Sequence, residues 1–379
     1  MRGPLENQKS RFEIPDGIAF FNCANMAPQL RSVREAGERA LARSSQPWQI
    51  RSSDWFTDVE RLRSLVARLI GGDEDGVALV PSTSYGLAVA ARNLDARPRS
   101  RVLTIAGDFP SAVYTWRAFA RRTGAEVRSV ARKEGRSWTD ALLEELDERV
   151  AVVSVPNVHW TNGALVDLQT VAERARSVGA AIAIDATQSL GAMPLDVGKL
   201  DPDFLVAAGY KWLLGPFGLG YLYVAERHRE GRPLEENWIS RAGSDDFTRL
   251  TDYRDEYQPG ARRFDVGQRT SFLLVPMAIA ALEQLLEWRV ERISRALAVH
   301  TDRIEREAEE RGLAPLSARE RGPHMLGIGL SGCVPAGLAG SLAARGVHVS
   351  VRAGVVRVAP HLYTTGSDIE RLLDALPRN

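Results

Sequence analysis

The stretch AIAIDATQSLGAMPLDVGKLDPDFLVAAGYK, residues 181–211, decides the fold. It holds two short apolar runs, AIAI and FLVAA, and a charged residue follows each of them, Asp185 after the first and Lys211 after the second. The runs are apolar at every position and not only at every second one, which is typical of strands buried on both faces. We therefore expect two central strands of a parallel sheet here.

Similar runs recur on both sides of this stretch, namely VALV (77–80), RVLTIA (101–106), VAVVSV (150–155) and LGYLYV (219–224). Segments with helical periodicity lie between the runs, at residues 85–93, 111–122, 139–146 and 168–178. Alternating strands and helices predict an α/β domain in which a mostly parallel sheet lies between two layers of helices.

The remainder of the chain predicts a second, smaller unit. Residues 232–263 form a charged stretch with Gly and Pro, too long for a routine connection and typical of a lid or an interface arm. A long helical region is expected at about 273–311, before a compact α+β unit. We expect an N-terminal arm at 1–30 that packs on the small domain, a large domain at 31–270, and a small C-terminal domain at 271–379 with the long linking helix.

Composition excludes several classes of protein. The 379 residues are 44% hydrophobic and 26% charged, which is typical of globular domains and excludes disordered and fibrous chains. Lys+Arg 49 against Asp+Glu 48 gives a net charge of +1, without the positive excess expected of a nucleic-acid-binding protein or a polybasic membrane contact. No apolar run approaches the roughly 18 residues of a membrane helix.

Cysteine usage and the N-terminal residues predict the compartment. Cys23 and Cys333 cannot form a disulfide framework or a four-ligand zinc site, and no metal site is expected. The polar start MRGPLENQKSR lacks the apolar core of a signal peptide. We therefore expect a cytoplasmic protein.

Lysine is rare in this chain, so the setting of each one is informative. Only four of the 49 basic residues are lysines, which leaves 45 arginines. Lys9, Lys133 and Lys199 lie in polar stretches or turns, whereas Lys211 follows the apolar run FLVAAGY. Burial disfavours an ammonium group and yields a neutral, nucleophilic amine. A lysine that snorkels from a strand end would explain the same pattern.

Polar residues follow the strands at the edge where ligands bind in open parallel sheets. The segment PSTSYG (81–86) opens a helix, and its hydroxyl and N–H groups suit a phosphate, although a simple Ser/Thr helix cap would explain it as well. Asn157, Asp185 and Lys211 follow three other strands. Together they suit pyridoxal phosphate (PLP), which needs a lysine for a Schiff base, an anion site for its phosphate and a carboxylate at its ring nitrogen.

These segments carry a family resemblance that covers essentially the whole chain. The sequence resembles the class V aminotransferases of PLP fold type I, a superfamily that includes cysteine desulfurases, selenocysteine lyases, kynureninases and isopenicillin N epimerase-like enzymes. The segments that carry the resemblance are IDATQSLG (184–191), AGYKWLLGPFGLGYLYV (208–224), STSYG (82–86), GDFPSAVYTW (107–116), SVPNVHWTNG (154–163) and RVAPHLYTTGSDI (357–369). The resemblance implies a large domain with a mostly parallel seven-stranded sheet, a smaller α+β C-terminal domain, and a homodimer with sites at its interface.

The resemblance also implies the site residues. Lys211 matches the Schiff-base lysine and Asp185 the partner of the ring nitrogen, and these two are the expected catalytic residues. The other cofactor-binding residues that it implies are Thr83, Ser84 and Tyr210 at the phosphate, Phe109 stacked on the ring, Asn157 and Gln188 at the ring oxygen, and Gln268 in the segment that reaches the partner subunit. The substrate-binding residues that it implies are Arg357 at the carboxylate, Arg352 beside it and Asn25.

The sequence departs from the family pattern at three places, one of which is Ala208, two residues before Tyr210, where the family usually has a serine that contacts the phosphate. The desulfurases carry a mobile loop with a nucleophilic cysteine, which is expected between Arg352 and Arg357, but only AGVV stands there. Persulfide formation is therefore not expected, and Cys23 and Cys333 are expected to be inert. The partner-subunit Gly-Thr of the family is Gly267-Gln268 here, which leaves the contact to the partner's phosphate open.

The expected function is transfer of the amino group of a small amino acid, as in a class V aminotransferase. A PLP-dependent lyase, acting on a C–S or related bond, or an epimerase is the first alternative, because all three reactions begin in the same way on the same cofactor. A non-catalytic PLP-binding regulator is the second, although no additional DNA-binding segment supports it. The expected partners are an amino-acid or keto-acid substrate and a second copy of the chain, with no nucleic acid and no membrane.

Overall fold

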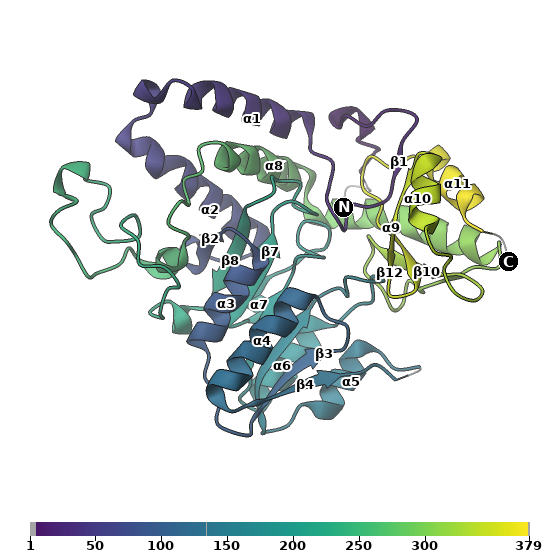
Figure 1. Cartoon of the computed structure of the whole chain (residues 1–379), viewed down its shortest axis with the longest axis horizontal. Helices are drawn as coiled ribbons and strands as arrows, with labels where there is room; N and C mark the ends of the chain where they lie inside the picture. The colour runs from purple at the N-terminus through teal and green to yellow at the C-terminus, as the bar shows by residue number, and fades with distance from the viewer. Residues whose placement is uncertain (1–4, 134, 378–379) are drawn as a thin grey trace.

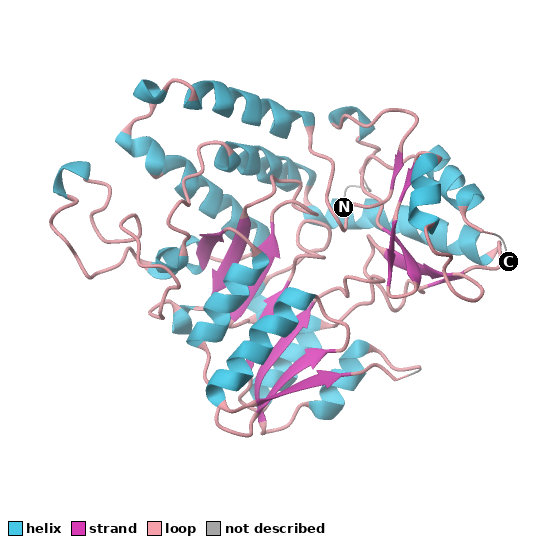
Figure 2. Ribbon diagram, viewed as in Figure 1, coloured by secondary structure: helices cyan, strands magenta, loops and turns pink. Residues whose placement is uncertain are grey.

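The computed structural model describes residues 5–133 and 135–377, which form a large α/β part and a smaller α+β part. Figures 1 and 2 show the large part with its sheet between helices, and the smaller part beside it. The expected fold class, an α/β chain with a smaller C-terminal α+β domain, is confirmed. Among the described residues, no helix is long and apolar enough to cross a membrane.

The large part is built on a seven-stranded sheet with the strand order β2-β8-β7-β6-β5-β3-β4. Strands β7, β6, β5, β3 and β4 are parallel to one another, whereas β8 is antiparallel to both β7 and β2, so the sheet is mostly parallel as expected. The strands are β2 (Val77–Val80), β3 (Arg101–Ile105), β4 (Glu126–Val130), β5 (Val150–Pro156), β6 (Ala181–Asp185), β7 (Phe204–Ala208) and β8 (Gly220–Val224).

Helices cover both faces of this sheet, and side chains of one strand alternate between two cores. In β6, Ile182 and Ile184 point into one core and Ala183 into the other. The first core lies under α2 (Thr57–Ile70), α5 (Trp138–Glu145), α6 (Leu168–Ser177), α7 (Val197–Leu200) and α8 (Leu274–Trp288), and the second under α3 (Thr83–Asn93) and α4 (Pro110–Thr123). Apolar residues at every strand position are therefore needed, which is the pattern seen in the sequence.

The smaller part contains a four-stranded antiparallel sheet, helices and the N-terminal segment of the chain. Its strand order is β12-β13-β10-β9, and β1 pairs in parallel with β11. The strands are β1 (Ala19–Phe20), β9 (Ala314–Pro315), β10 (Leu326–Gly329), β11 (Val347–His348), β12 (Ser350–Arg352) and β13 (Val355–Val358), and the helices are α9 (Val290–Glu309), α10 (Leu338–Ala344) and α11 (Gly366–Ala375). The first residues of the chain thus pack against its last hundred.

The structure differs from the expected elements in two respects. The helical region at 273–311 is not continuous, because Arg289 adopts a left-handed conformation with φ of 66° between α8 and α9. This turn lets both Trp288 and Val290 be buried on the core. Strand β4 was not expected, because its sequence EVRSV lies at the sheet edge and buries only Val130 fully.

The long stretch at 232–263 extends away from the sheet and contains only short turns, η6 (Phe247–Arg249) and the start of η7 (Gly260–Phe264) (Figure 1). Aromatic packing holds its base, where the rings of Trp55, Trp238 and Phe247 are 5.5 to 6.1 Å apart. The chain then returns to the sheet through Asp265, which is fully buried and pairs with Arg63 at 2.8 Å. Asp265 also accepts the N–H of Leu79 in β2 at 2.7 Å, so the segment that follows is fixed to the sheet edge.

Helix α1 (Arg31–Ser44) lies along α8 on the outside of the large part. A Cβ at Gly37 would lie 2.9 Å from Sδ of Met277 in α8. The two helices are therefore close together at this point, and the flexible methionine side chain would have to shift if Gly37 were larger.

Candidate active site

A cavity of about 190 Å³ opens at the carboxyl ends of the central strands, where open parallel sheets bind ligands. It gathers side chains from the segments after β2, β3, β6 and β7. Seven of the expected cofactor-binding residues line it, namely Thr83, Ser84, Phe109, Asp185, Gln188, Tyr210 and Lys211.

Lys211 lies at one wall of this cavity and is only 7% exposed. The chain reaches it through Gly209, where a Cβ would lie 2.8 Å from the carbonyl oxygen of Leu219, so the AAGYK sequence needs glycine for this close approach to the next strand. Burial lowers the pKa of Lys211 to about 8, an effect that Asp185 opposes and that Arg357 reinforces. At neutral pH a substantial fraction of this amine is thus uncharged and able to act as a nucleophile or base.

Asp185 is the last residue of β6 and faces the same cavity. Its Oδ1 accepts the N–H of Thr187 at 2.9 Å. Burial raises the pKa of Asp185 and outweighs both this hydrogen bond and the charge of Lys211, which lower it. A cation beside a buried carboxyl group stabilises its ionised form. A protonated ring nitrogen would supply such a cation and so favour ionised Asp185.

Gln188, one turn beyond Asp185, is held on both sides of its amide. Its Nε2 donates to the carbonyl oxygen of Ala24 at 3.0 Å, and its Oε1 accepts the indole N–H of Trp212 at 3.0 Å. An amide nitrogen carries two hydrogens, so one donor remains for a ligand oxygen.

The N-terminus of α3 forms the polar end of the cavity. Ser82 caps this helix, with its Oγ accepting the N–H of Tyr85 at 3.2 Å. The Oγ atoms of Ser82 and Ser84 are 2.9 Å apart, and Oγ1 of Thr83 lies 3.1 Å from Oγ1 of Thr187. Hydroxyl groups and free N–H groups at a helix N-terminus suit a phosphate dianion.

Aromatic side chains form the walls between these polar groups. Phe109 stands at the start of α4 and meets Trp160 edge to face, with ring centroids 5.6 Å apart. Nζ of Lys211 lies 5.6 Å from the ring centroids of both Phe109 and Tyr210. A flat aromatic ligand between Lys211 and such walls would be desolvated on its faces.

Arg357 lies outside this cavity but close to it. The residue is 2% exposed, and its Nη1 donates to the carbonyl oxygen of Trp160 at 2.7 Å. Its Nη2 lies 3.4 Å from Oδ1 of Asn22 and from Oγ of Ser350, and its Nε has no hydrogen-bond partner among the described residues. Burial and the nearby Arg352 lower the pKa of Arg357 to about 10. A buried guanidinium without a carboxylate partner is poised for an anionic ligand.

Arg352 shares a sheet face with Arg357, because β12 and β13 pair with Ser350 opposite Arg357 and Arg352 opposite Val355. Only Ala353 and Gly354 connect these strands, and both have positive φ, 44° and 79°. The connection is thus a two-residue hairpin turn.

Three other expected site residues do not line the cavity. Asn157 is buried beside it, and its side chain donates to the carbonyl oxygen of Val166 at 3.1 Å. Asn25 lies on an exposed turn, and it is Asn22 of the same segment that contacts Arg357. Gln268 is exposed and lies shortly after the long stretch at 232–263. The N–H of the preceding Gly267 donates to Glu235. The roles of these three residues stay predictions.

Two residues at this site escaped the sequence analysis. The side chain of Asn22 hydrogen-bonds to Ser350 and Arg357, which lie 328 and 335 residues further along the chain, so no local pattern indicates its place. Asp108 lines the cavity together with Asp185. Its position after β3 and directly before Phe109, at the same sheet edge as Asp185, was a usable signal.

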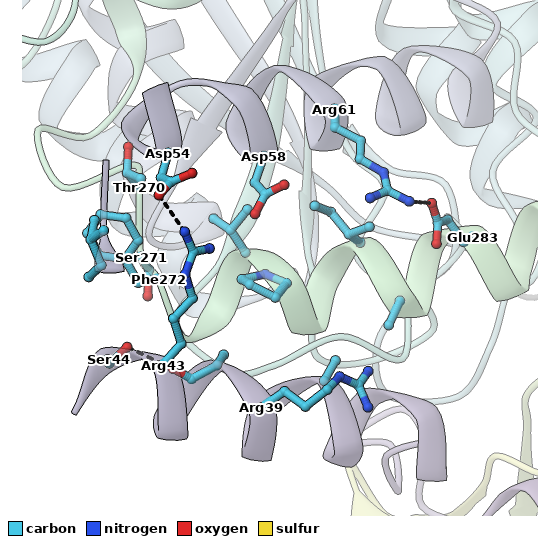
Figure 3. A pocket seen from close by; sticks show the side chains of 17 residues that line it. Arg39, Arg43, Ser44, Asp54, Asp58, Arg61, Thr270, Ser271, Phe272 and Glu283 are labelled. Atoms are coloured by element: carbon cyan, nitrogen blue, oxygen red, sulfur yellow. Dashed lines mark hydrogen bonds and ion pairs between the residues drawn. The ribbon is translucent and has the colours of Figure 1, made fainter. Parts of the chain in front are cut away.

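A larger cavity of about 330 Å³ lies elsewhere, between α1, α2 and α8 (Figure 3). Ion pairs between Arg43 and Asp54 and between Arg61 and Glu283 span its rim. No lysine lines this cavity, so it lacks the amine that a covalently bound PLP needs.

Comparison with known proteins identifies the family of the chain. The family model described as Aminotransferase class-V matches residues 39–372. An uncharacterized aminotransferase, YcbU of Bacillus subtilis (strain 168), is 28% identical over 350 residues, which cover 91% of each chain. Isopenicillin N epimerase of Streptomyces clavuligerus is 26% identical over 391 residues, covering 98% of this chain and 97% of the epimerase.

Solved structures of the protein C-DES share the fold. A mutant of C-DES with glycine covalently linked to its PLP cofactor superposes with a TM-score of 0.89 at 17% identity, covering 97% of this chain and 98% of that one. C-DES in complex with cysteine persulfide, where it is described as a cystine C-S lyase, gives a TM-score of 0.87 at 18% identity, covering 95% of this chain and 97% of that one.

The residues of the cavity fit PLP. A lysine with a lowered pKa, a buried carboxyl group with a raised pKa, and hydroxyl groups at a helix N-terminus match the aldehyde, the ring nitrogen and the phosphate of this cofactor in turn. With the cofactor chemistry and the family model in agreement, the chain belongs to the class V aminotransferase family of PLP-dependent enzymes.

Proposed function

We propose that the protein transfers the amino group of a small amino acid to a keto acid. The observation that carries this proposal is the pairing in one cavity of Lys211, whose pKa is lowered to about 8, with the buried Asp185. PLP, when bound, withdraws electrons from the Cα of an attached amino acid. The residues of the chain then have to hold the ring, orient the substrate and move one proton.

In this proposal Lys211 attaches the cofactor in the resting enzyme and afterwards serves as the base. Its amine takes the proton from Cα and delivers it to the neighbouring cofactor carbon, and a pKa near 8 suits both steps near neutral pH. Asp185 keeps the ring nitrogen protonated by its negative charge. Thr83 and Ser84, with the N-terminus of α3, hold the phosphate, and Phe109 covers one face of the ring.

Arg357 binds the substrate carboxylate in this proposal. Its unpartnered Nε and its weakly engaged Nη2 leave two donors for two carboxylate oxygens. Such a grip fixes the bonds of Cα relative to the cofactor. Arg352, on the same sheet face, adds positive charge at this end of the site.

Formation of a persulfide on a cysteine is not part of the proposed function. The two-residue turn at Ala353 and Gly354 leaves no room for a mobile cysteine loop between β12 and β13. Cys23 is fully buried, and burial raises the pKa of its thiol, which opposes the thiolate that such chemistry requires. Cys333 is exposed, in the turn after β10.

A homodimer is also proposed. Apolar side chains that line the cavity are exposed, among them Phe217 at 65% and Phe109 at 38%. A second copy of the chain would cover them and would bring its Gln268 segment near the cofactor phosphate. Sedimentation velocity of the purified protein tests this, and a monomer at micromolar concentration would contradict it. The cytoplasmic location stays a prediction from the sequence.

The reaction is tested by single turnover with a panel of L- and D-amino acids. Transfer releases one equivalent of keto acid per subunit without an acceptor, and a second keto acid then recovers the amino group as a new amino acid. Elimination instead releases ammonia and pyruvate continuously, and epimerisation yields the mirror-image amino acid with exchange of the Cα hydrogen. Either of these results, without stoichiometric keto acid, would replace the proposal.

A further inference from the structure

Asp108 is a second carboxyl group in the cofactor cavity, and the proposed mechanism does not use it. It follows β3 and directly precedes α4, and it lines the cavity together with Asp185. The residue is 7% exposed. One of its oxygens, Oδ1, accepts the N–H of Phe109 at 2.7 Å, so the carboxyl group is fixed at the base of the ring that faces Lys211.

The groups around Asp108 come from three neighbouring strand ends. Asp185, at the end of β6, lines the same cavity, and so do Tyr210 and Lys211 after β7. His159, after β5, lies behind the preceding loop, with its Nε2 3.3 Å from the carbonyl oxygen of Ala106. Among the described residues, no lysine, arginine or histidine forms an ion pair with Asp108. The charged group that most affects the ionisation of Asp108 is therefore another acid, Asp185.

This setting changes the ionisation of Asp108. Burial raises its pKa, and the nearby Asp185 raises it further, to about 7, against the opposing hydrogen bond from Phe109. Two carboxyl groups that share a cavity do not both ionise easily, since each negative charge disfavours the other. Near neutral pH, this pair of acids thus retains a proton when no cationic ligand is bound.

We propose that Asp108 is a positioning residue for the ring nitrogen of the cofactor, which releases its proton to solvent when a cationic ring enters and so places a second negative charge beside Asp185. The proposal rests on the PLP cofactor and not on the reaction that follows. A cation near two acids stabilises both as carboxylates, so the ring nitrogen keeps its proton more firmly than with Asp185 alone. Binding of a cationic ring is consequently linked to the ionisation of Asp108.

A purely structural reading of Asp108 makes a different prediction. In that reading its only task is to accept the N–H of Phe109 at the start of α4. Asp108→Asn keeps the size of the side chain and the oxygen that accepts this N–H, but it cannot ionise. A variant that loses only the charge therefore separates the two readings.

The test measures the affinity of the apoprotein for PLP and for deaza-PLP, in which a C–H replaces the ring nitrogen and no cation forms. Dissociation constants are determined for the wild type and for Asp108→Asn at pH 6 and pH 8.5. At each pH the dissociation constant of the variant is divided by that of the wild type, so that the titrations of the ligand itself cancel. For PLP, the affinity of the wild type relative to the variant should rise by at least about threefold between these values, because ionised Asp108 then attracts the cationic ring. For deaza-PLP the ratio should show no such rise.

Asp167→Asn is the matched control. Asp167 also accepts backbone N–H groups at the start of a helix, from Gln169 and Thr170, but it lies outside the cavity. Its ratio to the wild type should not change with pH. A PLP ratio for Asp108→Asn that is equally independent of pH, or a rise that deaza-PLP shares, would overturn the proposal while leaving the PLP assignment intact.

A second measurement needs no cofactor. The pKa of Asp108 is raised on folding from 3.8 to about 7, so the folded apoprotein holds a proton that the unfolded chain has released, and this contribution to stability is lost as pH rises through that window. The melting temperature of the wild-type apoprotein should therefore fall relative to that of Asp108→Asn between pH 4 and pH 7 and run parallel above it. A constant difference across the whole range would overturn the proposal even if the variant bound PLP poorly.

Discussion

The substitution Arg357→Lys tests how the substrate is held. Arg357 already donates through Nη1 to Trp160, which leaves Nε and Nη2 as the pair available to a carboxylate. Nη2 lies at 3.4 Å from two neutral oxygens, those of Asn22 and Ser350, and can turn toward a stronger acceptor with little loss. Lysine at this position keeps the positive charge but cannot present two parallel donors.

The expected magnitude follows from this geometry. A hydrogen bond to a charged group contributes about 1.5–3 kcal/mol, and the lysine variant loses about one of the two. This corresponds to an amino-acid dissociation constant that is about 10- to 150-fold higher. An amine that lacks the carboxylate makes neither bond, so its affinity should change by less than about twofold, an energy difference smaller than RT.

The assay compares the spectral titration of the holoenzyme with L-alanine and with ethylamine. PLP content and the melting temperature are measured in parallel, because Arg357 also joins the smaller part to the large part through Trp160. Arg352→Lys is the control on the same sheet face and should weaken alanine less. Equal losses for alanine and ethylamine, or no loss for either, would refute the assignment, and a larger effect at Arg352 would make that residue the carboxylate-binding arginine.

Three further outcomes are expected. Lys211→Ala protein treated with PLP and borohydride should carry no covalent adduct by mass spectrometry, and an adduct at Lys9, Lys133 or Lys199 would contradict this. Attachment of PLP to the wild type should accelerate with pH and level off above about pH 8, as most of the Lys211 amine becomes neutral. Asp185→Ala should lower turnover by about 10²–10³-fold, equivalent to about 3–4 kcal/mol of lost preorganised electrostatics, and near-normal turnover would count against its role. The double variant Cys23→Ser with Cys333→Ser should keep the amino-acid reaction, and strong loss with PLP still bound would support a persulfide mechanism.

Most of the fold could be predicted because strands buried on both faces appear in the sequence as short runs of apolar residues. The runs at β6 and β7 are apolar at every position, and both helical layers that make this necessary are present. The edge strand β4 was missed for the converse reason, since one of its faces is in water and its sequence EVRSV reads as polar. The break at Arg289 carries no Gly or Pro, so only tertiary packing of its neighbours accounts for it.

The candidate site divides in the same way. Lys211 and Asp185 follow directly from the rule that ligands lie beyond strand ends, since each terminates a run that the sequence displays. The surroundings of Arg357 could not be predicted, because Asn22 is 335 residues away along the chain. A single parallel bridge between Asn22 and Ala359 brings these segments together, and so short a pairing leaves no periodic pattern.

Asp108 shows what a reading by single residues leaves out. A short acidic residue before a helix is explained well enough by a helix cap, and nothing in GDFP alone distinguishes a capping carboxylate from one that faces a ligand. The distinction lies in the sheet order, where β3 is separated from β6 only by β5, so the ends of both strands reach one cavity. Acids at such an edge share an environment, and the ionisation of each depends on the others. The charge state of this site is therefore a property of the strand order as much as of any one side chain.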